Sequence, residues 1–201
     1  MRRPPEQLVE RMRIAVIGAG RIGGSLGTTW LKAGHDVVFG SRKPVDVGPG
    51  GAPATTVEAA ISDADVVLLA VPGSAVVEVI QANGKSLAGK IVIDAVNRVG
   101  EAQFNSRGVI AAEAAGALYV RAFNTLGWEN FVDPPDGADL FFAADPDAAV
   151  MAQELIAATG LRPVLVGDAE ASATVDALLP LWFALVQCNG GNRRLALRVV
   201  A

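Results

Sequence analysis

Two short motifs near the N-terminus have residue types and a spacing suited to binding a phosphorylated dinucleotide. The first, Gly18-Ala19-Gly20-Arg21-Ile22-Gly23, directly follows the apolar run Ile14–Ile17. A strand that leads into a glycine-rich turn at a helix start presents free backbone N–H groups and the positive end of the helix dipole to a pyrophosphate. Gly18 permits the tight turn, Gly20 lets the backbone approach the phosphates, and Gly23 lets helix and strand pack closely.

The second motif, Ser41-Arg42-Lys43, directly follows the apolar residues Val37–Phe39. Enzymes that use NAD usually carry an Asp or Glu about 20 residues after the glycines to bind the ribose 2′-hydroxyl, and this strand end has none. It offers a hydroxyl, a guanidinium and an ammonium instead, which suit a 2′-phosphate dianion. Together the motifs predict an NADP(H) site that prefers NADPH to NADH. Taken singly, the first could be an ordinary glycine-rich loop and the second a solvated loop.

Composition narrows the classes of protein that this chain can be. Its 201 residues allow one large domain, alone or with a small appendage. A net charge of −4 argues against a nucleic-acid surface. The longest apolar run, Ala177–Val186, contains Pro180 and is well short of the roughly 20 residues that a membrane span needs. Polar residues follow the basic Met1–Pro5 where a signal peptide would be apolar, so we expect a cytoplasmic protein that binds neither nucleic acid nor membrane.

The chain has a single cysteine, Cys188, and a single histidine, His35. An internal disulfide is therefore impossible, and a zinc site is not expected. We interpret Cys188 as a small buried apolar residue and not as a nucleophile, because no second histidine is present to activate it.

Beyond the motifs, short apolar runs alternate with helical segments, which predicts an α/β fold with a doubly wound, Rossmann-type parallel sheet and a short C-terminal helical appendage. We place an N-terminal extension at 1–12, an NADP-binding Rossmann domain at 13–167, and a C-terminal helix and tail at 168–201. The expected strands and helices are, in order, strand 14–17, helix 21–33, strand 37–39, helix 56–62, strand 66–71, helix 74–81, strand 91–93, helix 109–115, strand 118–123, strand 140–143, helix 147–159, strand 163–166 and helix 173–187.

The part after the Rossmann unit is too small to form a substrate domain. The second substrate must then be recognised by loops, by a dimer mate, or by both. The last helix is more apolar than a surface helix should be, so it either closes the core or packs across a twofold interface. We expect a homodimer. Arg193, Arg194 and Arg198 are interpreted as a solvated tail, or alternatively as contacts to an acidic acceptor.

Several segments resemble the NADPH-dependent reductases of the deazaflavin coenzyme F420 and the wider group of predicted NADP-binding oxidoreductases. The same nucleotide module occurs in the cytoplasmic part of membrane metalloreductases. The similarity covers Arg13 to about Phe183. It rests on the two motifs and on the segments Ala64-Asp65-Val66, Ala70-Val71-Pro72, Lys90–Asp94, Arg121–Gly127 and Pro180-Leu181-Trp182.

The resemblance implies a role for each group of site residues. Gly18, Gly20, Arg21, Ile22 and Gly23, with Ala19 between them, would hold the pyrophosphate, and Ser41, Arg42 and Lys43 the 2′-phosphate. Ala70, Val71 and Pro72 would line the nicotinamide side. Asn97 and Asn124 follow the next two strands, at the edge where an open α/β sheet binds substrate, although asparagine also ends strands for simple turn chemistry. Relatives commonly have an asparagine-proline pair after the residue equivalent to Asp94, whereas this chain has Asn97-Arg98-Val99.

The supply of proton donors separates the candidate reactions. Reduction of a carbonyl usually requires an acid close to the oxygen, but Tyr119 is inside a predicted strand, His35 is on the adenosine side, and no lysine follows Lys90. Hydride transfer to another planar redox cofactor needs mainly stacking and exclusion of water. We therefore expect an NADPH oxidoreductase with a small-molecule deazaflavin or flavin-like acceptor such as coenzyme F420, and assign no catalytic side chain and no metal. The alternatives are a reductase of an imine or small carbonyl and a non-catalytic NADPH sensor.

Overall fold

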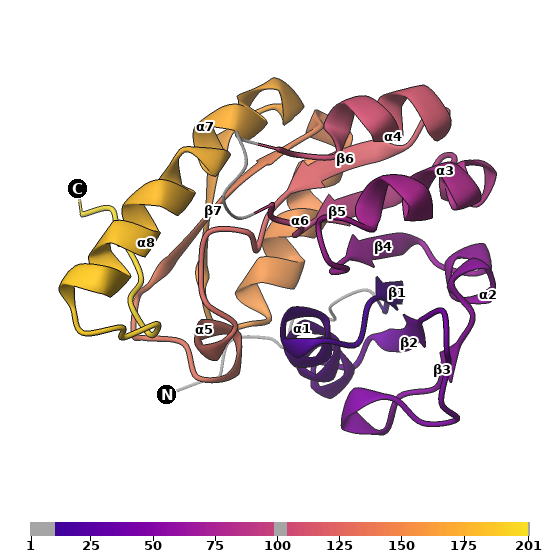
Figure 1. The fold of residues 1–201 in the computed structure, drawn as a ribbon, viewed down its shortest axis with the longest axis horizontal. Helices are drawn as coiled ribbons and strands as arrows, with labels where there is room; N and C mark the ends of the chain where they lie inside the picture. Colours follow the sequence, from indigo (N-terminus) through magenta and orange to yellow (C-terminus); the bar gives the residue numbers. More distant parts are fainter. Residues whose placement is uncertain (1–10, 99–103, 201) are drawn as a thin grey trace, which may run out of the picture.

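A computed structural model of the protein describes residues 11–98 and 104–200, and within them one eight-stranded sheet is flanked by helices (Figure 1). The strand order is β3-β2-β1-β4-β5-β6-β7-β8. The strands are β1 (Arg13–Ile17), β2 (Asp36–Gly40), β3 (Ala54–Thr55), β4 (Val66–Leu69), β5 (Ile91–Asp94), β6 (Leu118–Arg121), β7 (Asp139–Ala144) and β8 (Arg162–Gly167). The α-helices are α1 (Arg21–Lys32), α2 (Val57–Ser62), α3 (Val76–Leu87), α4 (Arg107–Glu113), α5 (Glu129–Val132), α6 (Pro146–Ala157), α7 (Ser172–Asp176) and α8 (Leu178–Cys188), and the 3-10 helices are η1 (Pro49–Gly51) and η2 (Ala169–Ala171).

The sheet confirms the doubly wound α/β class, with the last two strands, β7 and β8, running opposite to the other six. Pairing is parallel from β3 across to β6, and the chain changes direction in the sheet between β1 and β4. That position is the topological switch point, outside which open α/β sheets bind ligands. The predicted parallel pairing is confirmed from β3 to β6, and β7 adds a feature that the sequence did not indicate, since it is antiparallel to β6 and parallel to β8. The connection from β6 to β7 contains only the four-residue helix α5 and not the longer helix of a usual parallel crossover.

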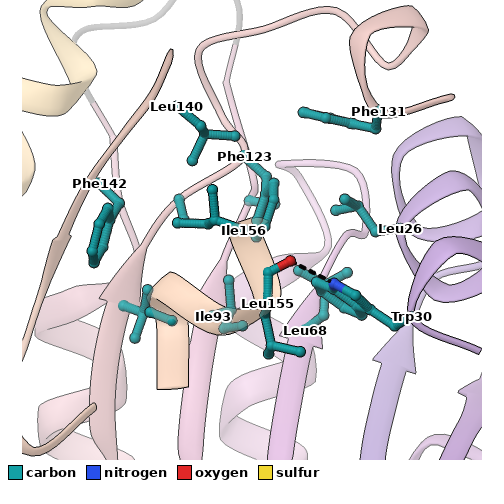
Figure 2. Close-up of a cluster of buried hydrophobic side chains, with 14 of the residues drawn as sticks. Leu26, Trp30, Leu68, Ile93, Phe123, Phe131, Leu140, Phe142, Leu155 and Ile156 are labelled. Carbon is teal, nitrogen blue, oxygen red and sulfur yellow. Dashed lines mark hydrogen bonds between the residues drawn. The ribbon is translucent and has the colours of Figure 1, made fainter. Parts of the chain in front are cut away.

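Two apolar layers cover the faces of the sheet. One contains Leu26 and Trp30 of α1 with Leu155 and Ile156 of α6, and the other lies under α2, α3 and α4. In the first layer the Trp30 indole donates to the Leu155 carbonyl at 2.9 Å, which joins α1 to α6 across the core (Figure 2). The two layers enclose β4 on both faces, since every residue of that central strand is buried.

Local structure departs from the sequence prediction where tertiary contacts decide it. Helix α3 continues to Leu87, past the expected end at Gln81, because Gly84 fits closely against the Glu113 backbone of α4. The two-residue strand β3 and the short helix α5 are not evident in the sequence. The single helix expected at 173–187 is divided at Ala177, since Pro180 has no N–H to continue the hydrogen-bond ladder.

The C-terminal helix α8 is only partly covered. Trp182 and Val186 are buried in the core, whereas Leu181 is 47% exposed. Cys188 is exposed, so the expectation that it is buried is wrong, because it lies at the open C-terminal end of α8. By length and composition alone, the stretch Ala169–Cys188 could cross a membrane; an 18-residue window within it has a mean hydropathy of 1.4, and 28% of that window is buried. Within this stretch, Asp176 is ion-paired to the buried Arg121. The homodimer and the lack of membrane binding stay predictions.

The arginine-rich tail is docked onto the domain and is not a free solvated tail. Arg193 pairs with Glu129, and Arg194 pairs with Asp133. The backbone N–H of Asp139 in β7 donates to the Leu197 carbonyl at 2.9 Å. The interpretation of this segment as solvated is therefore wrong for its backbone, because it adds hydrogen bonds to the start of β7.

His35, at the turn between α1 and β2, is buried with its Nε2 atom unpaired. Its Nδ1 accepts the Met12 backbone N–H at 3.4 Å, which requires the neutral tautomer with the proton on Nε2. Burial lowers the pKa of His35 from its ordinary value of 6.5, against weaker opposing effects of Glu154 and Asp36. The folded protein therefore keeps this imidazole neutral at pH values where the unfolded chain begins to protonate it.

Acidification should destabilise the fold through this histidine. Below about pH 6.5 the unfolded chain binds a proton that the folded chain takes up only at lower pH, so the free energy of unfolding falls as the pH drops through that range. Urea denaturation at several pH values between about 7 and about 5 would measure it. His35→Gln, which keeps an acceptor but does not titrate, should show a shallower decline. Parallel curves for the two proteins would contradict the assignment.

Candidate functional site

The glycine-rich turn after β1 is held by close contacts that leave no space for a side chain at Gly18 or Gly23. Gly18 has φ of +105°, and a Cβ there would lie 2.6 Å from the Ala70 carbonyl oxygen. A Cβ on Gly23 would lie 2.0 Å from the Gly18 carbonyl oxygen. A Cβ on Gly20, in contrast, would meet no atom within 4 Å. The space in front of Gly20 is therefore open, whereas the turn on either side is packed against β1 and β4.

Helix α1 begins at this turn with its N-terminus suited to an anion. Its N-cap residue, Gly20, supplies no side-chain cap, and its first turn contains no acidic residue. The helix start therefore offers unscreened N–H groups and positive dipole charge beside the open space. The Arg21 guanidinium lies over the Trp128 ring at 5.5 Å, which keeps this cation at the edge of the same turn.

The second motif lies beside the first because the ends of β1 and β2 are hydrogen-bonded. The Gly18 N–H donates to the Gly40 carbonyl at 3.1 Å, and the Ser41 N–H donates to Thr55 of β3 at 3.1 Å. Ser41, Arg42 and Lys43 line an open hollow of about 560 Å³. Among the described residues neither Arg42 nor Lys43 makes a salt bridge, whereas arginines such as Arg13 and Arg162 do. The hollow has two exposed cations available for an anionic ligand.

A smaller apolar pocket of about 160 Å³ lies past the carboxyl ends of β4, β5 and β6. Its lining residues are Ile22, Ala70, Val71, Ala95, Val96, Asn97, Phe123 and Leu126. Asn97 is the polar member of this set, and none of the set titrates. Because Ile22 belongs to the first turn of α1, the pocket adjoins the glycine-rich turn. A planar ring joined to a pyrophosphate at that turn could reach it.

Phe123 is held at the pocket in a backbone conformation that side chains rarely adopt. Its φ is +63°, and it is the only non-glycine residue with positive φ in the described part of the chain. Such a conformation costs roughly 1–3 kcal/mol and persists only when the surroundings fix it. The rings of Trp30 and Phe131 pack edge-on against Phe123 at centroid distances of 5.8 and 5.6 Å (Figure 2). Core packing therefore stabilises the turn that follows β6.

Beneath the pocket, Arg121 of β6 is 1% exposed and lies between two buried carboxylates. Its Nε donates to Asp176 of α7 at 2.7 Å, and its Nη1 lies 3.2 Å from Asp94 of β5. Burial alone would lower the pKa of Arg121, but the charges around it, that of Asp94 foremost, raise it, so the guanidinium stays charged. The Tyr119 hydroxyl donates to Asp94 at 2.9 Å, and burial, aided by that carboxylate, raises the pKa of the phenol well above its ordinary value. Tyr119 is thus a fixed structural donor and not an available acid.

The structure brings together only part of the predicted site. Ile22, Ala70, Val71 and Asn97 line the one pocket, and Ser41, Arg42 and Lys43 line the other hollow. Pro72 is not among the lining residues. Asn124 is not either, since it is 1% exposed and its side chain donates to Asp176 at 3.0 Å, while its carbonyl accepts from Asn97 at 2.6 Å.

Sequence reasoning missed Ala95, Val96, Phe123 and Leu126 as pocket residues and Asp94, Arg121 and Asp176 as the charged group beneath it. A signal was present for some of them. Asp94 ends an apolar strand run, and Arg121 and Phe123 lie in the Arg121–Gly127 segment. Asp176 gave none, because only the fold brings α7 to the end of β5.

Comparison with known proteins identifies the nucleotide-binding part. Residues 13–98, from β1 through the end of β5, match the family described as NADP oxidoreductase, coenzyme F420-dependent. Metalloreductase STEAP3 of Rattus norvegicus is 29% identical over 188 residues, which cover 86% of this chain. The chain spans only 38% of the length of that metalloreductase.

Three solved structures share the fold. A protein of Arthrobacter sp. FB24, provisionally described as an F420-dependent NADP reductase, has a TM-score of 0.78 with 21% identity, over 94% of this chain and all of that one. A hypothetical protein of Sinorhizobium meliloti has a TM-score of 0.68 with 30% identity, over 80% of this chain and 87% of that one. The reductive aminase of Aspergillus terreus, solved with NADPH and ethyl levulinate, has a TM-score of 0.67 with 19% identity, over 89% of this chain and 63% of that one.

Three observations indicate the same nucleotide-binding region. They are the packed turn at Gly18 and Gly23, the cationic hollow after β2 and the family match over residues 13–98. Residues 13–98 of this chain are therefore similar to the nucleotide-binding part of the NADP oxidoreductases described as coenzyme F420-dependent.

Proposed function

We propose that the protein transfers hydride between NADP(H) and a planar deazaflavin or flavin-like acceptor such as coenzyme F420. The observation that carries this proposal is the pocket after β4, β5 and β6, where none of the described lining residues has a titratable side chain. The family match to coenzyme F420-dependent oxidoreductases supports the same acceptor. The nicotinamide ring supplies the hydride, and the protein needs to supply position, close approach and exclusion of water.

Each part of the site has a separate task in this proposal. The open space at Gly20 and the uncapped start of α1 hold the pyrophosphate, and Arg42 and Lys43 hold the 2′-phosphate. Ala70 and Val71 form an apolar wall against which one face of the nicotinamide packs. The acceptor stacks on the opposite face, so the reacting carbon atoms approach each other without an intervening acid.

Reduction of an imine or a small carbonyl is the second candidate. It is favoured by the likeness in fold to the Aspergillus terreus reductive aminase solved with NADPH and ethyl levulinate, which at 19% identity bears on fold alone. A carbonyl or imine substrate would have to take its proton from solvent, because Tyr119 is committed to Asp94. The residues that the structure describes around the pocket, Asn97 and apolar side chains, offer no acid in its place.

Charge reversal at Arg42 should weaken NADPH binding selectively. Arg42→Glu removes one cation from the hollow and adds an anion, so we expect the dissociation constant for NADPH to rise by about 10- to 100-fold and that for NADH to change little. Lys85→Glu, the same charge change on an exposed helix position, is the matched control. Titration calorimetry with both nucleotides measures the ratio. Equal losses for the two nucleotides would remove Arg42 from the 2′-phosphate site.

Gly20 and Gly23 should respond differently to the same small substitution. Gly23→Ala places a methyl group 2.0 Å from a carbonyl oxygen, which we expect to cost about 1–3 kcal/mol of stability. Gly20→Ala meets open space, so its unfolding free energy should stay within about 0.5 kcal/mol while NADPH affinity falls about tenfold or more. Thermal denaturation and NADPH titration of both variants test this pair. A Gly20→Ala protein with unchanged NADPH affinity would place the pyrophosphate elsewhere.

The acceptor is tested by mixing the purified protein with NADP⁺ and reduced coenzyme F420 and following the absorbance of NADPH and of the oxidised deazaflavin. We expect both bands to rise together, since each hydride lost by one cofactor is gained by the other. A parallel series with flavins, cyclic imines and small ketones ranks the alternatives. Turnover of an imine or a ketone without turnover of any flavin-like acceptor would replace the proposal by the second candidate.

A further inference from the structure

The guanidinium of Arg121 is fully used in fixing the carboxyl end of β5. Its Nη1 donates to the carbonyls of Asp94 and Val96 at 3.0 and 2.8 Å, and its Nη2 donates to Asn97 Oδ1 at 3.2 Å. Its Nε is taken by Asp176, so each of its three nitrogen atoms has an acceptor. Three successive contacts along residues 94–97 hold the segment that forms one wall of the apolar pocket. No lysine could make all of them, because an ammonium lacks the planar fork of donors.

These contacts also decide which way the Asn97 amide points. Arg121 can only donate, so it requires the oxygen of Asn97 at that position, and the Asn124 carbonyl can only accept, so it requires the nitrogen. An amide oxygen and nitrogen are otherwise interchangeable in shape. With one lone pair and one N–H engaged, Asn97 has one lone pair and one N–H left at the wall of the pocket. This free acceptor and this free donor are complementary to the donor and acceptor of a second carboxamide.

We propose that Arg121 is a positioning residue that sets the Asn97 amide to recognise the carboxamide of the nicotinamide ring. The inference rests on the proposed function, because it takes the apolar pocket as the nicotinamide pocket. Asn97 is the polar residue among those that line it, so it is the group there that can fix the rotation of the ring by hydrogen bonding. A fixed rotation decides which face of the ring is turned to the acceptor.

The network also links the pocket to the C-terminal helices. Asp176 of α7 accepts from Arg121 at 2.7 Å, from Asn124 at 3.0 Å and, through its second oxygen, from Asn105 at 3.0 Å. Asp176 is 4% exposed, so these bonds are made away from solvent. Helix α7 therefore supports the Asn97 amide from behind and does not itself line the pocket.

The test compares two ligands that differ only beyond the adenosine half. NADPH carries the nicotinamide, and adenosine 2′,5′-bisphosphate does not. For Asn97→Ala and Arg121→Lys we expect about a tenfold loss of NADPH affinity, with the affinity for adenosine 2′,5′-bisphosphate unchanged within about twofold. Arg162→Lys is the matched control, because Arg162 also pairs with a buried carboxylate, that of Asp139, at the far edge of the sheet. It should change the affinity for neither ligand.

The double variant Asn97→Ala/Arg121→Lys separates positioning from general support of the fold. If Arg121 acts on the ring through Asn97, the double variant binds NADPH no more weakly than Asn97→Ala alone. Additive losses, equal losses for the two ligands, or unchanged NADPH affinity in Asn97→Ala would each overturn the proposal. Should Arg121→Lys not fold, Asn97→Ala alone decides it, because that variant leaves the charged group intact. A wild-type protein whose ligand affinity does not depend on the 2′-phosphate would instead count against the proposed function.

Discussion

The buried guanidinium of Arg121 joins three segments that are far apart in the sequence. Arg121 belongs to β6, and its guanidinium pairs with Asp94 at the end of β5 and with Asp176 of α7. Removing one partner of a buried ion pair leaves the other charge uncompensated in a medium of low dielectric constant, which is strongly destabilising. The strand ends that form the pocket are therefore fixed together, and the pocket keeps its shape through interactions that its lining residues do not make themselves.

A second constraint unites the two nucleotide-binding loops. The backbone hydrogen bond from the Gly18 N–H to the Gly40 carbonyl holds the end of β2 directly beside the glycine-rich turn. The unscreened helix start and the exposed cations of Arg42 and Lys43 then share one edge of the sheet. A ligand with two separate phosphate groups could contact both loops at once, because backbone hydrogen bonds hold the ends of β1 and β2 side by side.

The chemistry follows from what these constraints place around the pocket. Among the described residues, apolar side chains and one oriented amide line it, and the phenol of Tyr119 is held by Asp94 beneath the surface. Under the proposed function, such an environment suits transfer of hydride between two stacked rings better than protonation of an isolated oxygen. The positive φ of Phe123 is maintained by the rings of Trp30 and Phe131, so core packing also fixes the turn that lines the pocket.

The sequence by itself determined the nucleotide-binding half of the protein. The glycine spacing, the basic strand end and the apolar strands are local patterns, and local patterns report on backbone requirements that arise within a few residues. They predicted the α/β sheet, a preference for NADP and most positions in β1, β2, β4 and β5. Only the tertiary structure decided the reversal of β7, the docking of the arginine-rich tail and the partnership of Asp94, Arg121 and Asp176. Those features depend on contacts between residues more than 20 positions apart, and no periodicity or spacing in a single sequence encodes which distant charges will be buried together.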